Sequence, residues 1–424
     1  MPPIPKPAIP LRKRIWSALG PGLVTGAADD DPSGIATYSQ AGAQFGYTLA
    51  WTMFLTLPFM AAIQIISACI GWGTRQGLAT NIGQRLPRPV LYGIVALLAA
   101  ANTINIAADL AAMGEALTLV IGGYAFIYAF AFGVACVVTE IFIPYHRYAG
   151  YLKIATFILF AYVATAFSVR IPWGEVLAAT FLPRLSLDRD VLLTLVAVFG
   201  TTISPYLFFW QASQEVEESR LSHRHRHETK TSPEEYFTHI SIDTWTGMAF
   251  SNVVAFFIII TTAATLHAHG VTNIQTAAQA AEALRPLAGD LTFFLFAAGI
   301  IGTGLLAVPV LAGSAAYAVA ETFGFRGSLE LPASRALGFY ALISAATFIG
   351  AALAVTRIDP IAMLFWAAVI NGIVSVPIMI AMMLVVAGGK HMGPLAIPRW
   401  LRALGWASAA LMAFTVVALI WSSL

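Results

Sequence analysis

Long apolar runs, separated by short polar segments, form the dominant pattern along this chain. A helix needs about 20 mostly apolar residues to cross a hydrocarbon core about 30 Å thick. Segments of this kind lie at 18–44, 47–71, 90–117, 120–141, 151–169, 191–214, 240–266, 291–320, 335–355, 360–387 and 403–422. The pattern predicts an all-α integral membrane protein with about eleven transmembrane helices in a single domain over residues 1–424.

The composition agrees with lipid as the main solvent of the chain. Hydrophobic residues make up 58% of the sequence and charged residues only 10%, whereas soluble domains carry roughly 25% charged residues. The net charge of +2 gives no reason to expect a nucleic-acid partner. Cys69 and Cys136 lie in apolar runs, so we expect neither a disulfide nor a thiolate metal site. No cofactor and no obligate protein partner is indicated.

The distribution of Lys and Arg predicts the orientation in the membrane. With the N-terminus in the cytoplasm, only five of the 23 Lys and Arg residues fall outside, as the positive-inside rule requires. Those five are Arg170, Arg184, Arg189, Arg285 and Arg357. We therefore expect a multi-pass protein of a cell membrane, the inner membrane in a bacterium, with the N-terminus cytoplasmic and the C-terminus outside.

Two of the predicted spans contain residues that disfavour a continuous helix. The first contains "GPGLVTGAADDDPSG" and the sixth contains "VFGTTISPYLFFWQAS". Each combines small residues with a proline, which cannot donate a backbone hydrogen bond. These spans open two consecutive five-helix sets, 18–169 and 191–387, with 403–422 as an extra helix. Interrupted helices at matching positions of two halves are typical of inverted-repeat transporters, whose substrate site lies at the breaks.

Three adjacent aspartates, Asp29, Asp30 and Asp31, lie at the first break. One charged side chain at mid-bilayer costs about 2.5–3.5 kcal/mol on insertion scales, so we expect a cation or a wet cavity to compensate. Asp31 is the favoured ligand because the Pro-Ser-Gly break follows it directly. Asp before Pro is also a favoured helix N-cap, and we expect that role alongside ligation. Asp29 and Asp30 could instead point to water or to neighbouring helices.

The groups expected opposite Asp31 are hydroxyls, amides and backbone carbonyls. The sixth span offers Thr201, Thr202 and Ser204, and the tenth offers Asn371 and Ser375. Hard oxygen ligands of this kind suit Mg²⁺, Ca²⁺ or Mn²⁺. One carboxylate among neutral oxygens favours a cation that keeps much of its water, and Mg²⁺ dehydrates reluctantly.

The motif "GPGLVTGAADDDPSGIATYSQAGAQFGY", with "GTTISPYLFFWQ" and "INIAADLAAMGEAL", resembles the Nramp family of divalent-metal transporters, in particular its magnesium-transporting relatives. The resemblance implies a LeuT-type inverted repeat of five plus five helices, with helices one and six broken. By position, Asp31 takes the place of the family's metal-binding aspartate and Gly34 that of its asparagine. In the sixth span Ser204 takes the place of the methionine, and Thr201 supplies the equivalent carbonyl.

The departures from the family pattern imply a substrate and a mode of transport. Loss of the thioether at Ser204 and of the amide at Gly34 favours a larger, hydrated, hard ion, so Mg²⁺ is expected, with Mn²⁺ also carried. Tyr206 and Gln211 stand where proton-coupled members carry histidines, and Asp109 alone remains of the family's acidic pair in the third span. We therefore expect uptake that is driven by the membrane potential, without proton co-transport.

The predicted metal ligands are thus Asp31, Gly34, Thr201, Ser204 and Asn371. The residues expected to line the cavity or to lie behind these ligands are Asp30, Ser33, Asn102, Asp109, Thr202, Tyr206, Gln211 and Ser375. Asn102 and Asn105, close together on the third span, either line this cavity or simply bond neighbouring helices. The alternating histidines of "SHRHRHETK" could bind metal, but a basic cytoplasmic loop is the preferred interpretation.

Three alternative functions stay open at this point. The first is a proton-coupled Mn²⁺ or Fe²⁺ transporter of the Nramp type. The second is an amine or amino-acid carrier on the same scaffold, although Asp31 at the break would repel a substrate carboxylate. The least favoured is an intramembrane aspartyl hydrolase, which would need two carboxylates that share a proton. The interrupted sixth span has no role in that reaction.

Overall fold

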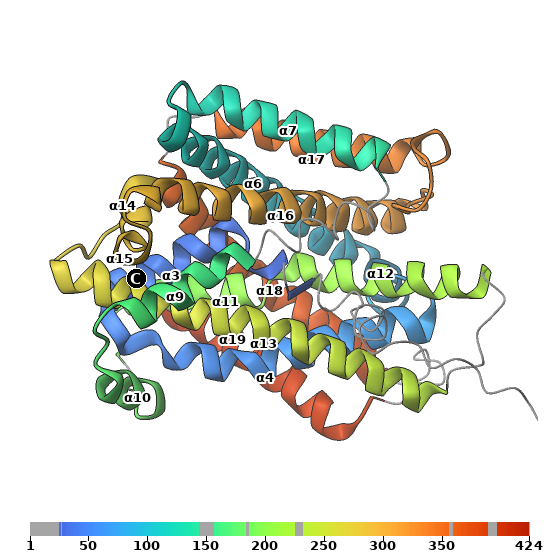
Figure 1. Ribbon diagram of the computed structural model, residues 1–424. Coiled ribbons are helices and arrows are strands. Elements are labelled where there is room, and N and C mark those ends of the chain that lie inside the picture. The colour runs from blue at the N-terminus through green and yellow to red at the C-terminus, as the bar shows by residue number, and fades with distance from the viewer. Residues whose placement is uncertain are drawn as a thin grey trace, which may run out of the picture.

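Helices are the regular elements of this protein throughout the part of the chain that its structure, a computed structural model, describes (Figure 1). The described residues are 25–26, 28–143, 157–183, 186–224, 232–355, 359–388 and 397–423. No strand occurs within these ranges, as expected for an all-α membrane protein. The long helices are α4 (Trp51–Thr74), α6 (Arg88–Ile121), α7 (Ala125–Phe142), α13 (Pro233–Thr265), α16 (Thr292–Phe323), α17 (Leu337–Ala354), α18 (Pro360–Ala387) and α19 (Arg399–Ser422). Broken or shorter helices are α3 (Pro32–Phe45), α5 (Leu78–Arg85), α9 (Phe160–Ser168), α10 (Trp173–Phe181), α11 (Arg189–Thr202), α12 (Pro205–Arg224), α14 (Ala277–Glu282) and α15 (Arg285–Ala288).

The observed helices account for the predicted spans. Within the described ranges, 9 segments are long and apolar enough to cross a membrane, with α11 and α12 taken together as one. The pair Phe157–Ser168 and Trp173–Phe181, bent by 119°, provides a tenth. Helix α3, which follows the first break, is too short at 14 residues to be counted by this criterion. These candidate spans agree with the prediction of about eleven membrane helices, and α18 matches its predicted limits of 360–387.

The fifth segment differs from the sequence-based prediction. A single span over 151–169 was expected, but α9 is followed by α10, which folds back at a bend of 119°. Pro172 precedes α10 at its N-cap position, and a proline there cannot extend α9 as a continuous helix. Residues 151–156 lie outside the described residues.

Helix α6 lies at the centre of one half of the molecule and contacts α7, α16, α17 and α18. Figure 1 shows α7 and α17 side by side, with α6 and α16 beneath them. The other half packs α3 against α11, α13 and α18, and α4 against α12, α13 and α19. The broken segments α3, α11 and α12 are thus enclosed by long helices rather than facing lipid.

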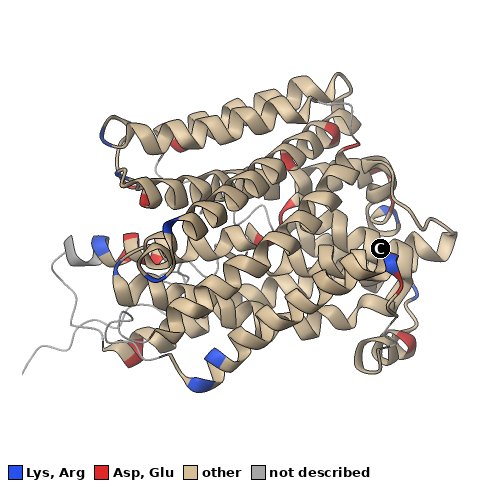
Figure 2. Ribbon diagram, turned by 180° about the vertical axis from the view of Figure 1, so that it is seen from behind, with Lys and Arg blue, Asp and Glu red and all other residues tan. Residues whose placement is uncertain are grey.

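The outward-facing side chains are those of a protein surrounded by lipid. Phe126, Phe130 and Phe142 on α7 and Phe414 and Trp421 on α19 are all exposed. A soluble monomer rarely exposes apolar surface on this scale. Lys and Arg lie toward the ends of the helices, whereas several Asp and Glu residues lie deeper in the helical bundle (Figure 2). The protein is therefore a multi-pass membrane protein with acidic groups in its interior.

Two glycines allow helices to approach closely beside the breaks. A Cβ atom on Gly200 of α11 would lie 2.1 Å from the carbonyl oxygen of Ala368 on α18. A Cβ atom on Gly26, just before the first break, would lie 2.4 Å from the backbone of Gly247 on α13. Both distances are far inside van der Waals contact, so only glycine permits this packing at either position.

Candidate functional site

The first break lies at Asp30 and Asp31, between a helical stretch that includes Asp29 and the start of α3 at Pro32. Asp31 is extended, with φ −69° and ψ 170°, and is the N-cap of α3. Its Oδ1 accepts hydrogen bonds from the Gly34 backbone N–H (2.8 Å) and from Ser33 Oγ (2.6 Å). The N-cap role expected for Asp31 is confirmed, and Pro32 at the first helical position fits it.

The second break lies at Ile203 and Ser204, between α11 and α12. Pro205 begins α12 and has no N–H to donate to the preceding turn. The Ser204 hydroxyl lies 2.9 Å from the Gly200 carbonyl oxygen and 2.7 Å from that of Thr201. It therefore donates to the carbonyls at the end of α11, and its oxygen keeps lone pairs for a further partner.

The two breaks are in contact with each other. Ser33 Oγ lies 3.5 Å from Thr201 Oγ1, and a Cβ atom on Gly34 would lie 3.2 Å from the same Thr201 oxygen. Tyr38 OH lies 3.1 Å from Thr202 Oγ1. These distances join α3 to the last turn of α11, as an inverted-repeat transporter requires.

Helix α6 supplies a further contact to the first break. Asn105 Nδ2 donates a hydrogen bond to Asp31 Oδ2 at 3.0 Å. Asp109 lies one turn further along the same face of α6 and is fully buried. The third span therefore contacts Asp31 through the Asn105 amide and carries a buried carboxylate one turn away.

Asp29 and Asp30 face a neighbouring helix, which is one of the two outcomes expected for them. Ser251 Oγ on α13 lies 2.7 Å from Asp29 Oδ2 and 2.9 Å from Asp30 Oδ1. Both carboxylates are buried, with exposed fractions of 0% and 1%. They do not share the contacts that Asp31 makes with α6.

Buried acceptor oxygens are in excess around the breaks. Within the described residues, the side-chain oxygens that lack a hydrogen-bond partner there include Asp29 Oδ1, Asp30 Oδ2, Asn102 Oδ1, Asn105 Oδ1, both oxygens of Asp109, and Asn371 Oδ1. Asp29, Asp30, Asp31 and Asp109 form no ion pair with any Lys or Arg among the described residues. Carboxylate and amide oxygens only accept hydrogen bonds, and a buried polar group without a partner is costly. The arrangement therefore favours species that bring positive charge or hydrogen-bond donors.

Other predicted site residues make their contacts elsewhere. Asn102 donates to the Leu311 carbonyl (2.9 Å) and to Ser314 Oγ (2.7 Å) of α16. It therefore bonds a neighbouring helix, which is one of the two roles that the sequence left open for it. Ser375 donates to the Gly372 carbonyl of its own helix at 2.8 Å. Asn371, also on α18, is buried, and neither its amide oxygen nor its nitrogen has a partner among the described residues.

Tyr206 and Gln211 connect α12 to the first half of the first span. Tyr206 OH donates to the Ala28 carbonyl at 2.9 Å. Gln211 accepts from Thr25 Oγ1 (2.5 Å) and donates to Glu215 Oε1 (2.9 Å). Neither side chain takes up a proton as histidine does near neutral pH.

Sequence reasoning missed Tyr38 and Ser251 and left Asn105 undecided. Tyr38 lies seven residues after Asp31, which places it on the same face of α3, so helical spacing could have found it. Nothing in the local sequence marks Ser251. His225 and His227 lie outside the described residues. Within the described residues, no group of three His, Cys, Asp or Glu side chains is arranged to hold a metal.

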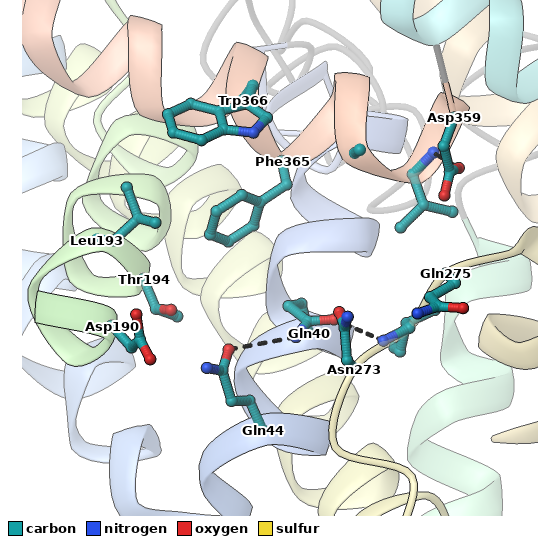
Figure 3. Close-up of a pocket in the computed structure, with 13 residues that line it drawn as sticks. Gln40, Gln44, Asp190, Leu193, Thr194, Asn273, Gln275, Asp359, Phe365 and Trp366 are labelled. Carbon is teal, nitrogen blue, oxygen red and sulfur yellow. Dashed lines mark hydrogen bonds between the residues drawn. The ribbon is translucent and has the colours of Figure 1, made fainter. Parts of the chain in front are cut away.

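A cavity of about 260 Å³ lies at the far end of α3 from the break (Figure 3). Gln40 and Gln44 of α3 face Asp190 and Thr194 of α11 and Asp359 before α18 across it. Gln40 also bonds the connection before α14, through the Thr272 carbonyl (3.3 Å) and the Ile274 N–H (2.9 Å). The described residues that line this cavity include the carboxylates of Asp190 and Asp359, which favour a cation.

Comparison with known proteins decides the family. The family described as "Natural resistance-associated macrophage protein-like" (Nramp) matches residues 22–422. The chain belongs to the Nramp family. The divalent metal cation transporter MntH of Yersinia pestis (strain Pestoides F) is 30% identical over 307 residues, which cover 70% of each chain.

Solved structures support the fold of this Nramp protein. The Eremococcus coleocola manganese transporter superposes with a TM-score of 0.72 at 16% identity, over 97% of this chain and 87% of that one. Mhp1, a nucleobase-cation-symport-1 family transporter, superposes with a TM-score of 0.55 at 13% identity, over 96% and 92% of the two chains. The LeuT-type architecture and the Nramp resemblance expected from the sequence are both confirmed.

Proposed function

We propose that this Nramp protein is a divalent metal cation transporter that carries Mg²⁺, and also Mn²⁺, by alternating access. The observation that carries the proposal is the contact between two broken spans beside Asp31, in a buried region where acceptor oxygens are in excess. The relatives named as divalent metal and manganese transporters support the class of substrate. Because these relatives are transporters, the hydrolase alternative fails, and the protein is not an enzyme.

The proposed ligands are Asp31, Gly34, Thr201, Ser204 and Asn371, of which Gly34 can contribute only backbone atoms. All of these groups offer oxygen, and oxygen ligands favour Mg²⁺, which usually keeps several waters in proteins. Gly34 has no side chain, and an added Cβ would meet Thr201 Oγ1 at 3.2 Å. Ser204 contributes a hydroxyl where the Nramp resemblance places a thioether.

Uptake needs no proton gradient in this proposal. A divalent cation gains about 4.6 kcal/mol per 100 mV of membrane potential, which is twice the value for a single charge. Tyr206 and Gln211 stand where the Nramp resemblance places histidines, and they bond the Ala28 carbonyl and the Thr25 hydroxyl. We propose that neither side chain relays protons. The proposed orientation has the N-terminus in the cytoplasm, so that the 260 Å³ cavity opens to the outside. The membrane would be the inner membrane of a bacterium.

Uptake into proteoliposomes tests this function. We expect Mg²⁺ and Mn²⁺ to enter under an imposed inside-negative potential, with no acidification of the lumen. Amino acids and organic amines should neither enter nor compete. Acidification that tracks metal entry would overturn the uncoupled mechanism, and competition by amines would overturn the choice of substrate.

A further inference from the structure

Asn105 is the residue outside the first span that fixes the Asp31 carboxylate. Oδ1 of Asp31 is held by Gly34 and Ser33 within its own cap, whereas Oδ2 accepts from the Asn105 amide at 3.0 Å. The carboxylate is therefore held at both oxygens. Oδ1 uses both of its lone-pair sites on Ser33 and Gly34, whereas Oδ2 keeps one for a cation.

The same contact fixes which way the Asn105 amide points. A flipped amide would bring its oxygen to the position 3.0 Å from Asp31 Oδ2, and two acceptors would then face each other. The amide oxygen of Asn105 must therefore point elsewhere. It is fully buried and has no hydrogen-bond partner among the residues that the structure describes.

Two further residues on this face of α6, Asn102 and Asp109, carry buried acceptor oxygens. Asn102 lies almost one turn before Asn105, and Asp109 lies one turn after it, within about 10 Å along the helix axis. Asn102 Oδ1 and both Asp109 oxygens are buried and lack partners in the described ranges. A bare cation satisfies only the few oxygens that it touches. A hydrated cation presents water O–H groups, and these can donate to acceptors that do not touch the metal.

We propose that Asn105 is a specificity-determining residue of the transporter: its amide nitrogen positions Asp31, and its amide oxygen accepts a hydrogen bond from water that the cation retains. This inference rests on the proposed function. By this inference, the third span recognises the water molecules that stay bound to the cation. Mg²⁺ holds its water more tightly than the softer Mn²⁺, so Mg²⁺ depends more strongly on this acceptor.

Paired uptake measurements on three variants test the role of Asn105. Asn105→Leu removes the donor and the acceptor, whereas Asn105→Asp removes the donor and keeps an acceptor. Thr103→Val is the matched control on α6, because the Thr103 hydroxyl donates to the Ala99 carbonyl of its own helix at 2.8 Å. KM is measured for Mg²⁺ and Mn²⁺ in proteoliposomes of each variant.

Asn105→Leu should raise the ratio of the Mg²⁺ KM to the Mn²⁺ KM by roughly 10-fold, the scale of losses when groups behind metal ligands are removed. Asn105→Asp should raise it less, and Thr103→Val should leave it unchanged. An unchanged ratio in Asn105→Leu, equal loss for both ions, or equal shifts in the Leu and Asp variants would overturn the inference. In each of those cases, Mg²⁺ uptake by the unaltered protein would still support the proposed function, and its absence would overturn both.

Discussion

The Tyr206 hydroxyl donates a hydrogen bond to the Ala28 carbonyl, 2.9 Å away, and so joins the second half of one broken span to the first half of the other. Thr25 and Gln211 make a second such bond nearby, and Gly26 packs against the Gly247 backbone. These contacts hold the segment before the first break against α12 and α13. At the other end of α3 lies the 260 Å³ cavity. In the proposed orientation, this cavity opens toward the outside of the cell.

Replacing Asp31 by Asn and by Ala should separate its two roles. Asn is as good an N-cap as Asp, whereas Ala costs about 1 kcal/mol at this position. Both variants lose the negative charge, so both should abolish metal uptake, but only Asp31→Ala should lower the melting temperature clearly. Uptake that persists in Asp31→Asn would show that the carboxylate is not a ligand.

Tyr206→Phe should remove the bond to Ala28 without altering the choice of ion. The expected loss of stability is about 1 kcal/mol, typical of one hydrogen bond, measured as a lower melting temperature in detergent. The ratio of Mg²⁺ to Mn²⁺ uptake and its dependence on pH should match those of the unaltered protein. A changed pH profile would instead assign Tyr206 to proton movement.

Ser204→Met should shift the preference toward Mn²⁺ and Cd²⁺ because it adds a soft ligand at the second break. Ser204→Ala is the control, since it also removes the bonds to the Gly200 and Thr201 carbonyls but adds no sulfur. Competition of Cd²⁺ against Mg²⁺ uptake measures the preference. If the Met and Ala variants respond alike, the thioether is not what sets selectivity.

Gly200→Ala should be strongly destabilising because the new Cβ would lie 2.1 Å from the Ala368 carbonyl oxygen. Overpacking of this kind costs about 1–3 kcal/mol or more. Gly93→Ala is the matched comparison, since a Cβ at Gly93 of α6 meets no atom within 4 Å, and Ala favours a helix by about 0.5–1 kcal/mol over Gly. Thermal unfolding should therefore shift in opposite directions. Equal melting temperatures would contradict the close contact of α11 with α18.

Much of the local structure could be predicted because its causes are local. A run of apolar residues must be helical in lipid, so 360–387 was placed correctly from hydrophobicity alone. Proline interrupts a helix, so Pro32 and Pro205 marked the two breaks, and the structure begins α3 and α12 at these residues. The fold of α10 back on α9 was missed, because the direction of a chain after a turn depends on what it packs against.

The sequence by itself determined that the chain spans a membrane, where two of its helices break, that Asp31 caps the second half of the first span, and which family the motifs resemble. Only the tertiary structure decided that Asn105 rather than Asn102 reaches Asp31, and that Ser251 meets Asp29 and Asp30. Asn102 and Asn105 are alike in residue type and lie three positions apart on the same helix. Their partners differ because Asn102 meets α16 whereas Asn105 meets the N-cap of α3, and which helix lies against a given position of α6 is set by packing over the whole molecule.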